Sequence, residues 1–125
     1  MATIELTLKN FEGVVSSNDV VLIDFWAAWC APCRAFAPTY EKVSLLYPNA
    51  VSAKVDTEAQ HALAASFHIL AIPTLMIMRH TDVVFTRAGA LREKALVKTI
   101  EKVLAKDACD AGRRTRPWPG PSRSF

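Results

Sequence analysis

Apolar residues along the chain follow two different spacings, and the alternation between them predicts the order of strands and helices. Short apolar runs rich in β-branched residues predict strands, whereas apolar residues at steps of three and four predict helices. The predicted strands cover residues 4–6, 20–26, 50–56, 72–80 and 82–88. The predicted helices cover residues 7–17, 31–47, 57–69 and 91–107. Thr7 and Thr57 are the expected N-caps of the first and third helices.

The order of these elements predicts the fold class. Strands that alternate with helices imply a mostly parallel sheet with helices on both faces, and the hairpin over residues 72–88 adds antiparallel strands at one edge. Residues 20–26 form an apolar run interrupted only by Asp24, as is typical of a strand buried on both faces. Pro38 lies inside the second helix and is expected to kink it. We therefore expect an α/β fold of three layers, with a central mixed five-stranded sheet flanked by four helices.

The length of 125 residues corresponds to one domain, which we assign to residues 1–107. Residues 108–125 are rich in Arg, Pro, Gly and Ser without periodicity, so we expect a disordered basic extension there. No apolar run approaches the roughly 18 residues that span a bilayer, and the N-terminus has no basic segment followed by an apolar one. These features lead us to expect a cytoplasmic monomer that makes no membrane contact.

The net charge of +3 is concentrated near the C-terminus. Residues 1–107 carry 11 Lys and Arg against 11 Asp and Glu. The excess comes from four arginines, Arg113, Arg114, Arg116 and Arg123, set against Asp110. A neutral domain offers no electrostatic surface for nucleic acid, and four arginines beside Trp118 are weak support for a nucleic-acid or acidic partner. We expect no nucleic-acid partner.

Two of the three cysteines, Cys30 and Cys33, are separated by two residues and follow the strand at 20–26. An odd, small number of cysteines without a secretion signal argues against a disulfide framework. A metal site needs about four ligands. The other candidates are scattered along the chain: Cys109, His61, His68 and His80. A metal site and a purely structural pair are the less favoured alternatives, and we expect a redox-active dithiol and no metal.

The position of this pair at the start of a predicted helix gives the two sulfurs different roles. Unpaired N–H groups and the dipole at a helix N-terminus favour an anion, so the Cys30 thiolate is the expected attacker. Cys33, one turn further along and more sheltered, is expected to resolve the mixed disulfide.

Asp24 lies six residues before Cys30, inside the buried strand. Desolvation there is expected to raise the pKa of its carboxyl. We expect Asp24 to accept and return the proton of Cys33, directly or through a water. The alternative is a hydrogen-bonded buried acid without a catalytic role.

The motif VLIDFWAAWCAPCRAFAP, together with AIPT and AGAL, is similar to the thioredoxin family over about residues 3–105. The resemblance implies a thioredoxin-like fold and dithiol–disulfide oxidoreductase activity, with Cys30 as nucleophile and Cys33 as resolving cysteine. Asp24 matches the family's buried acid, and Lys54 matches the lysine near it. The residues expected to form the substrate-binding surface are Trp29, Ala31, Pro32, Ile72, Pro73, Gly89 and Ala90.

The resemblance also implies a cis bond before Pro73 and a substrate chain that pairs with the Ile72 backbone. Simpler interpretations exist for several of these residues. Trp29 could pack in the core, to which we assign Trp26, while Lys54 could be an ordinary solvated lysine. Pro73 could start its strand with a trans bond, and Gly89 could serve only a turn.

The chain departs from the family pattern at several places, two of which bear on the site and the fold. Ala31 replaces the usual glycine between the cysteines, which stiffens the turn and narrows the contact with substrate or reductase. The hairpin RHTDVV lacks the usual Asn-Gly turn. Because Thr81 disfavours positive φ, we expect another turn type at this hairpin.

The expected function is the reduction of disulfide bonds in proteins. The resemblance implies that an NADPH-dependent flavoprotein, thioredoxin reductase, restores the dithiol. The chain has no glycine-rich nucleotide fingerprint, so we expect no cofactor besides the Cys30–Cys33 pair. Two alternatives remain: an exported thiol oxidant or isomerase, and a non-enzymatic module that binds a partner around Trp29, Ile72 and Gly89.

Overall fold

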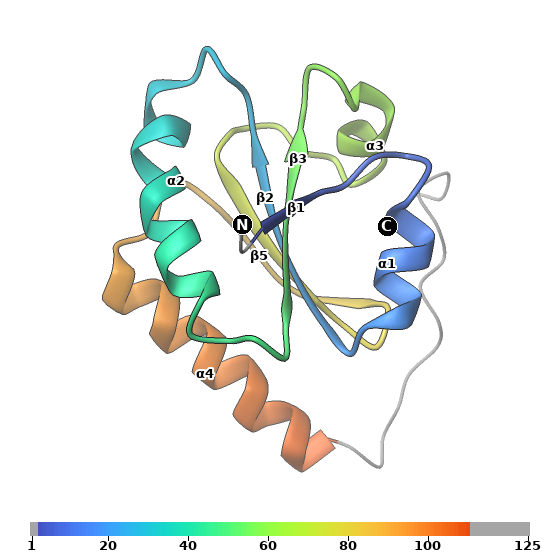
Figure 1. The fold of residues 1–125 in the computed structure, drawn as a ribbon, viewed down its shortest axis with the longest axis vertical. Coiled ribbons are helices and arrows are strands. Elements are labelled where there is room, and N and C mark those ends of the chain that lie inside the picture. Colours follow the sequence, from blue (N-terminus) through green and yellow to red (C-terminus); the bar gives the residue numbers. More distant parts are fainter. Residues whose placement is uncertain (1–2, 111–125) are drawn as a thin grey trace.

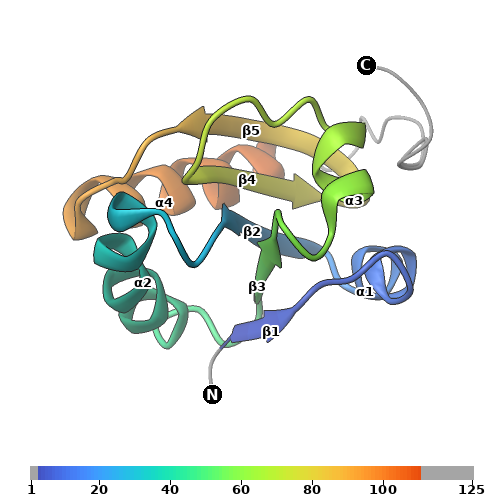
Figure 2. The ribbon, with the colours of Figure 1, turned by 90° about the horizontal axis from the view of Figure 1, so that it is seen from above.

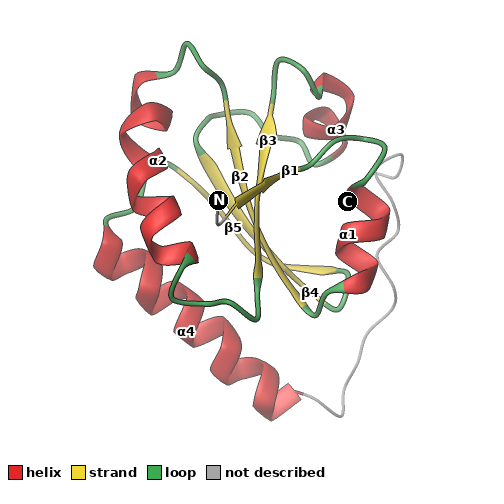
Figure 3. Cartoon of the chain, in the orientation of Figure 1, coloured by secondary structure: helices red, strands yellow, loops and turns green. Residues whose placement is uncertain are grey.

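The structure is a computed structural model that describes residues 3–110, with side chains up to residue 105 (Figures 1 and 3). The strands are β1 (Thr3–Glu5), β2 (Val20–Trp26), β3 (Val51–Asp56), β4 (Thr74–Arg79) and β5 (Asp82–Ala88). The helices are α1 (Phe11–Ser17), α2 (Ala31–Ser44), α3 (His61–Ser66) and α4 (Glu93–Asp110). Within the described residues, no helix is both long and apolar enough to cross a membrane.

The five strands form one mixed sheet in the order β1-β3-β2-β4-β5, with β2 at its centre (Figure 2). Strands β1, β3 and β2 are parallel, because α1 and α2 carry the chain back between consecutive strands. Strand β4 pairs antiparallel with β2, and β5 pairs antiparallel with β4. The predicted three-layer α/β fold with an antiparallel edge is confirmed.

Two helices cover each face of the sheet (Figure 2). Beneath α1 and α3, the rings of Phe11 and Phe67 lie 5.5 Å apart in the first core. Beneath α2 and α4, the second core contains Tyr40, Leu96 and Ile100. Complete burial of a large apolar side chain contributes roughly 1.5–3 kcal/mol, so both cores stabilise the sheet between them.

Strand β2 contributes side chains to both cores. Residues at odd positions join the core beneath α1 and α3, namely Val21, Ile23 and Phe25. Val20 and Leu22, at even positions, join the core beneath α2 and α4. Asp24 occupies the next even position and is fully buried. The central strand therefore carries an ionisable group into the apolar layer beneath α2.

Helix α1 begins later than predicted, at Phe11, and Thr7 is not its N-cap. Asn10 Oδ1 accepts a hydrogen bond from the Thr7 N–H at 2.7 Å, and Thr7 Oγ1 accepts one from the Asn10 N–H at 3.3 Å. Short polar side chains that bond nearby backbone groups compete with helix formation. The reciprocal pair holds a turn where the sequence pattern predicted helix.

Helix α3 is likewise shorter than predicted and begins at His61, so Thr57 is not its N-cap. Asp56 Oδ1 accepts hydrogen bonds from the N–H groups of Glu58 and Ala59, at 2.9 and 3.3 Å. These bonds fix a separate turn between β3 and α3. The side chain that caps backbone N–H groups in this segment is therefore that of Asp56, the last residue of β3.

The C-terminal ends of α2 and α4 also differ from prediction. Helix α2 contains Pro38, as expected, but ends at Ser44 rather than at residue 47. Helix α4 continues to Asp110, so the first three residues of the expected extension are helical and include Cys109. The rest of that extension, and the disorder expected for it, lies outside the described residues.

The hairpin between β4 and β5 adopts the turn that we expected it to avoid. His80 and Thr81 both have positive φ, 50° and 72°. Two successive residues with positive φ are typical of a type I′ turn, whose twist matches that of the flanking strands. The His80 N–H donates to the Asp19 carbonyl at 2.8 Å, which fixes this turn against the chain before β2.

Replacing Thr81 with Gly should stabilise the protein, because glycine reaches positive φ without the Cβ clash that a β-branched residue suffers. We expect the free energy of unfolding in urea to rise by about 1 kcal/mol. Thr86→Gly, an exposed threonine in β5, is the matched control and should lose roughly 0.5–1 kcal/mol. A Thr81→Gly protein that is less stable than the unaltered chain would contradict the strain assigned to this turn.

Candidate active site

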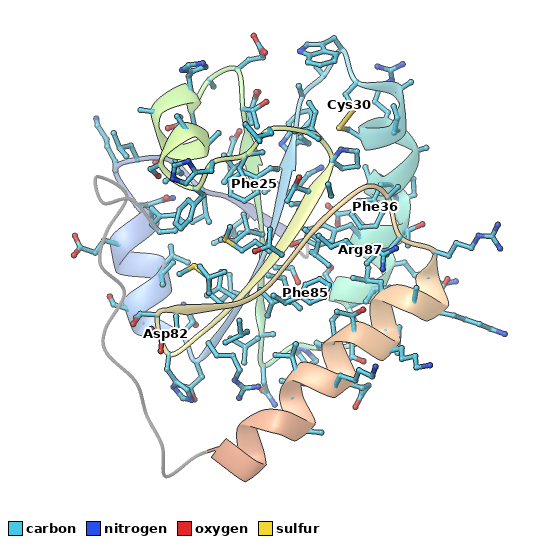
Figure 4. All side chains as sticks on the ribbon, turned by 180° about the vertical axis from the view of Figure 1, so that it is seen from behind. Phe25, Cys30, Phe36, Asp82, Phe85 and Arg87 are labelled. Atoms are coloured by element: carbon cyan, nitrogen blue, oxygen red, sulfur yellow. A yellow bond between two sulfur atoms is a disulfide. The ribbon has the colours of Figure 1, made fainter. Side chains whose placement is uncertain are left out.

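The loop between β2 and α2 places Cys30 at one end of the sheet (Figure 4). Cys30 is the N-cap of α2, and Cys33 lies in the first turn of the helix. Pro32 also lies in this turn, where its missing N–H costs no hydrogen bond. The Cys30 Sγ accepts a hydrogen bond from the Cys33 N–H at 3.2 Å, and the two sulfurs are joined in a disulfide.

The two cysteines are almost equally buried, although we expected Cys33 to be clearly the more sheltered of the two. The exposed fraction is 4% for Cys30 and 2% for Cys33. Both pack with Ala27, and Trp26 and Ile72 lie against this small cluster. In the disulfide form, the two sulfurs therefore differ in their position on α2 and hardly in their burial: Cys30 is at the N-cap and Cys33 is in the first turn.

A second loop, between α3 and β4, reaches the disulfide from the other side. The Ile72–Pro73 peptide bond is cis, as predicted. The Ile72 carbonyl oxygen lies 3.8 Å from the Cys30 Sγ. This contact joins residues that are 42 positions apart in the sequence.

A third loop, after β5, is tied to the second by one backbone hydrogen bond. The Gly89 N–H donates to the Pro73 carbonyl at 2.7 Å. Gly89 has φ of +101°, a conformation that L side chains rarely adopt, and the Ala90 that follows is exposed. Gly89 is therefore a turn glycine that also lies at the edge of the redox site.

The exposed part of the site is formed by residues next to Cys30. Trp29 is 68% exposed, and its Nε1–H donates to Glu58 Oε2 at 3.2 Å. Ala31 and Pro32 are exposed as well. The alternative that Trp29 packs in the core is therefore wrong, and its indole ring is accessible beside the disulfide.

The carboxyl group of Asp24 is buried without compensation. Neither of its oxygens has a hydrogen-bond partner within the described part of the chain. Its neighbours in the sheet are Lys54 on β3 and Leu75 on β4. Burial raises the pKa of Asp24 to about 7, against an opposing effect of the Lys54 ammonium, because desolvation penalises the ionised form.

Lys54 is not the ordinary solvated lysine of the simpler interpretation. It is half-buried, and its Nζ lies 4.8 Å from the centre of the Trp26 ring. A cation above an aromatic face is attracted by the ring quadrupole. This contact directs the ammonium towards the layer that holds Asp24.

Trp26 is the site residue that sequence reasoning missed, because we assigned it to the core. It is only half-buried, and it contacts both the cysteine cluster and the Lys54 ammonium. The available signal was its spacing: in a strand, Trp26 shares a face with Asp24, two positions earlier. Trp26 thus lies between the disulfide and the Asp24–Lys54 pair.

The scattered histidines do not assemble into a metal site within the described residues. No three His, Cys, Asp or Glu side chains in this part of the chain could hold a metal ion together. The side chain of Cys109 is outside the residues for which side chains are described.

Comparisons with known proteins point to one family. The thioredoxin family profile matches residues 2–102. A protein described as a thioredoxin 2, from Streptomyces coelicolor, is 54% identical over 99 residues, covering 79% of this chain and 74% of that protein. Thioredoxin C-3 from Corynebacterium nephridii is 43% identical over 102 residues, covering 81% and 70%. The solved thioredoxin of Plasmodium falciparum superposes with a TM-score of 0.75 at 34% identity, covering 80% of this chain and 97% of that one.

Asp24 should make the stability of the protein depend on pH. Its pKa is about 7 in the folded state and near 3.8 in the unfolded chain, so the folded state binds more protons between these values. The free energy of unfolding therefore falls as the pH rises from about 4 to about 7, and it levels off above that. Asp24→Leu should remove this decline and raise stability at pH 8 by on the order of 3–4 kcal/mol.

Urea unfolding at a series of pH values measures this effect. Glu12→Gln is the control, because Glu12 is an exposed acid on α1 and its loss should leave the decline in place. If Asp24→Leu still loses stability between pH 4 and 7 as the unaltered chain does, another group causes the decline.

Proposed function

Because the chain belongs to the thioredoxin family, whose members are thiol–disulfide oxidoreductases, we propose that Cys30 and Cys33 together reduce disulfide bonds in substrate proteins. The observation that carries this proposal is the disulfide between Cys30, at the N-terminus of α2, and Cys33, in its first turn. Opening and closing this bond transfers two electrons in each cycle.

The reaction proceeds in two exchange steps. The Cys30 thiolate attacks one sulfur of the substrate disulfide; a new S–S bond forms, the substrate bond breaks, and the other substrate sulfur leaves as a thiolate. Cys33, once deprotonated, attacks the Cys30 sulfur of this mixed disulfide. The substrate is released with both of its sulfurs reduced. Cys30 and Cys33 have then given up two electrons and are joined in a disulfide.

Asp24 is proposed as the group that takes the proton from Cys33. A pKa of about 7 supports this role, because a base with its pKa near the working pH can both accept and return a proton. The Lys54 ammonium, in register with Asp24, opposes the burial effect and keeps the ionised form accessible.

The substrate chain is proposed to lie across the three loops that meet at the disulfide. Trp29, Ala31 and Pro32 border one side of the site. Ile72, Pro73, Gly89 and Ala90 border the other, and the Ile72 backbone pairs with the substrate chain. Backbone pairing of this kind gives affinity with little dependence on sequence, which fits broad selectivity.

We further propose that an NADPH-dependent flavoprotein, thioredoxin reductase, returns the electrons, and that the chain works as a monomer in the cytoplasm, where it serves electron transport and redox homeostasis. The Cys30–Cys33 pair is the only redox group that this reaction requires of the chain. The family similarity at residues 2–102 supports the reductase as partner. An oxidised protein that dithiothreitol reduces, but that reductase with NADPH does not, would overturn this assignment.

Single-cysteine variants test the two roles, in a Cys109→Ser background that removes the third thiol. Cys30→Ser should reduce NADPH-coupled turnover of a disulfide-bonded test protein to background, because the attacking thiolate is lost. Cys33→Ser should also lose turnover but accumulate a mixed disulfide through Cys30, which mass spectrometry of the unreduced sample detects. If Cys30→Ser keeps its cellular function, the chain is a binding module instead.

Asp24→Asn tests the proton transfer while keeping nearly the same side-chain shape. Exchange with a test disulfide at pH 7 should slow on the order of 10- to 100-fold, because the amide cannot accept the proton of Cys33. Asp19→Asn is the surface control and should leave the rate unchanged. An Asp24→Asn protein that is folded by circular dichroism and exchanges at the unaltered rate would remove Asp24 from the mechanism.

A further inference from the structure

A second buried titratable group, Tyr40, lies in the same layer as Asp24. Tyr40 is on α2, one turn after Phe36, whose ring is 5.8 Å away (Figure 4 shows Phe36 on the helix that begins beside Cys30). It is only 1% exposed. Its hydroxyl donates a hydrogen bond to the Ala53 carbonyl at 2.8 Å. A buried tyrosine whose hydroxyl is hydrogen-bonded can be purely structural. Whether Tyr40 also has a functional role depends on the groups around its hydroxyl.

The strand register places the Tyr40 hydroxyl and the Asp24 side chain over the same face of the sheet. The Lys54 carbonyl accepts from the Leu6 N–H, so it points towards the chain at the β1 edge. Successive carbonyls of a strand point to opposite neighbours, so the Ala53 carbonyl points towards β2. Asp24 is in register with Lys54, the residue that follows Ala53. The hydroxyl therefore lies over the boundary between β3 and β2, on the face from which the Asp24 side chain projects.

The surroundings of this pair contain few other charges. Across the sheet, β4 presents Leu75 beside Asp24, and α4 presents Leu96 and Ile100 to the same core. The charged groups that act here are Lys54 on β3, which opposes the effect of burial on Asp24, and Glu41, next to Tyr40 on α2. Tyr40 and Asp24 thus share a largely apolar layer.

The direction of the Tyr40 proton determines which protonation state of Asp24 the hydroxyl favours. A tyrosine hydroxyl has one proton, and here that proton is directed to Ala53. The oxygen can then only accept. An ionised carboxylate is also acceptor-only, whereas a protonated carboxyl can donate. No hydrogen bond joins Tyr40 to Asp24 among the described residues, so the hydroxyl acts across the layer. With its proton turned to Ala53, the oxygen presents only lone pairs to the rest of the layer, and these disfavour the carboxylate relative to the neutral acid.

We propose that Tyr40 is a positioning residue for Asp24, whose hydroxyl oxygen, held with its proton on Ala53, favours the protonated carboxyl over the carboxylate. An electrostatic interaction between the two groups is consistent with the pKa of Tyr40. This pKa is raised mainly by burial and, to a smaller extent, by the charge of Asp24. The effect of Tyr40 on Asp24 does not depend on the proposed function. Its consequence for catalysis, which is that Tyr40 helps Asp24 to hold a proton near neutral pH, rests on that function.

The two tyrosines of the chain provide a matched pair of variants. Tyr40→Phe removes the buried hydroxyl, and Tyr47→Phe removes one that donates to Glu101 at 2.7 Å on the surface. The titration of the Asp24 carboxyl carbon, followed by NMR of labelled protein, gives its pKa directly. Tyr40→Phe should lower the pKa of Asp24 by roughly half a unit to one unit. Tyr47→Phe should leave it unchanged.

A rise in the Asp24 pKa in Tyr40→Phe would mean that the hydroxyl turns its proton towards the carboxylate, and it would overturn the proposal, as would no change. If the variant fails to fold, the unaltered protein provides the test. The ring carbon that bears the Tyr40 hydroxyl must then shift with the same pKa as Asp24, and a flat resonance overturns the proposal.

The pH profile of disulfide exchange separates this proposal from the role of Asp24. Tyr40→Phe should move the profile to lower pH in the unaltered background and leave it unmoved in Asp24→Asn. If the NMR titration shifts but the exchange profile does not, Tyr40 acts on Asp24 as proposed and the proton transfer through Asp24 is wrong.

Discussion

Asp24 sits in the middle of the central strand, and both of its carboxylate oxygens lack a hydrogen-bond partner among the described residues. The ionised form is disfavoured there, which raises the pKa to about 7. Strand β2 has neighbours on both sides and helices above and below, so the fold keeps the Asp24 carboxyl buried. The position of Lys54 matters because its ammonium lowers the free energy of the ionised Asp24 carboxylate. Trp26 matters because its ring contacts that ammonium.

The redox site depends on the same strand. Strand β2 ends at Trp26 and α2 begins at Ala31, so a short loop fixes Cys30 at the N-cap of the helix. Phe36 and Tyr40 anchor that helix in the second core. The remaining loops of the site flank the β4–β5 hairpin, on the antiparallel side of the sheet. The thiol chemistry thus comes from one half of the fold and the expected substrate surface largely from the other.

Local pattern predicted the bounds of two strands correctly. Strands β2 and β5 match their predicted bounds, since both are apolar or β-branched runs between turn residues. The starts of α1 and α3 were missed because side chains such as Asn10 and Asp56 bond nearby N–H groups, which residue type alone does not show. The turn at His80 and Thr81 and the packing around Cys30 involve partners that are distant in sequence: Asp19 contacts His80, and Ile72 contacts Cys30.

Two residues of the layer that holds Asp24 act on its carboxyl in opposite directions: Lys54 favours the carboxylate, and Tyr40, as proposed, favours the acid. A leucine at this position would pack without penalty but could carry no proton, and a solvated aspartate would stay ionised throughout the neutral range. A buried carboxyl near a cation keeps its two forms close in free energy at neutral pH, which a group that accepts and returns a proton in one cycle requires. The stability lost above pH 4 is therefore a consequence of that requirement, and it is confined to one side chain because the apolar neighbours of Asp24 in β2 pack fully into the two cores.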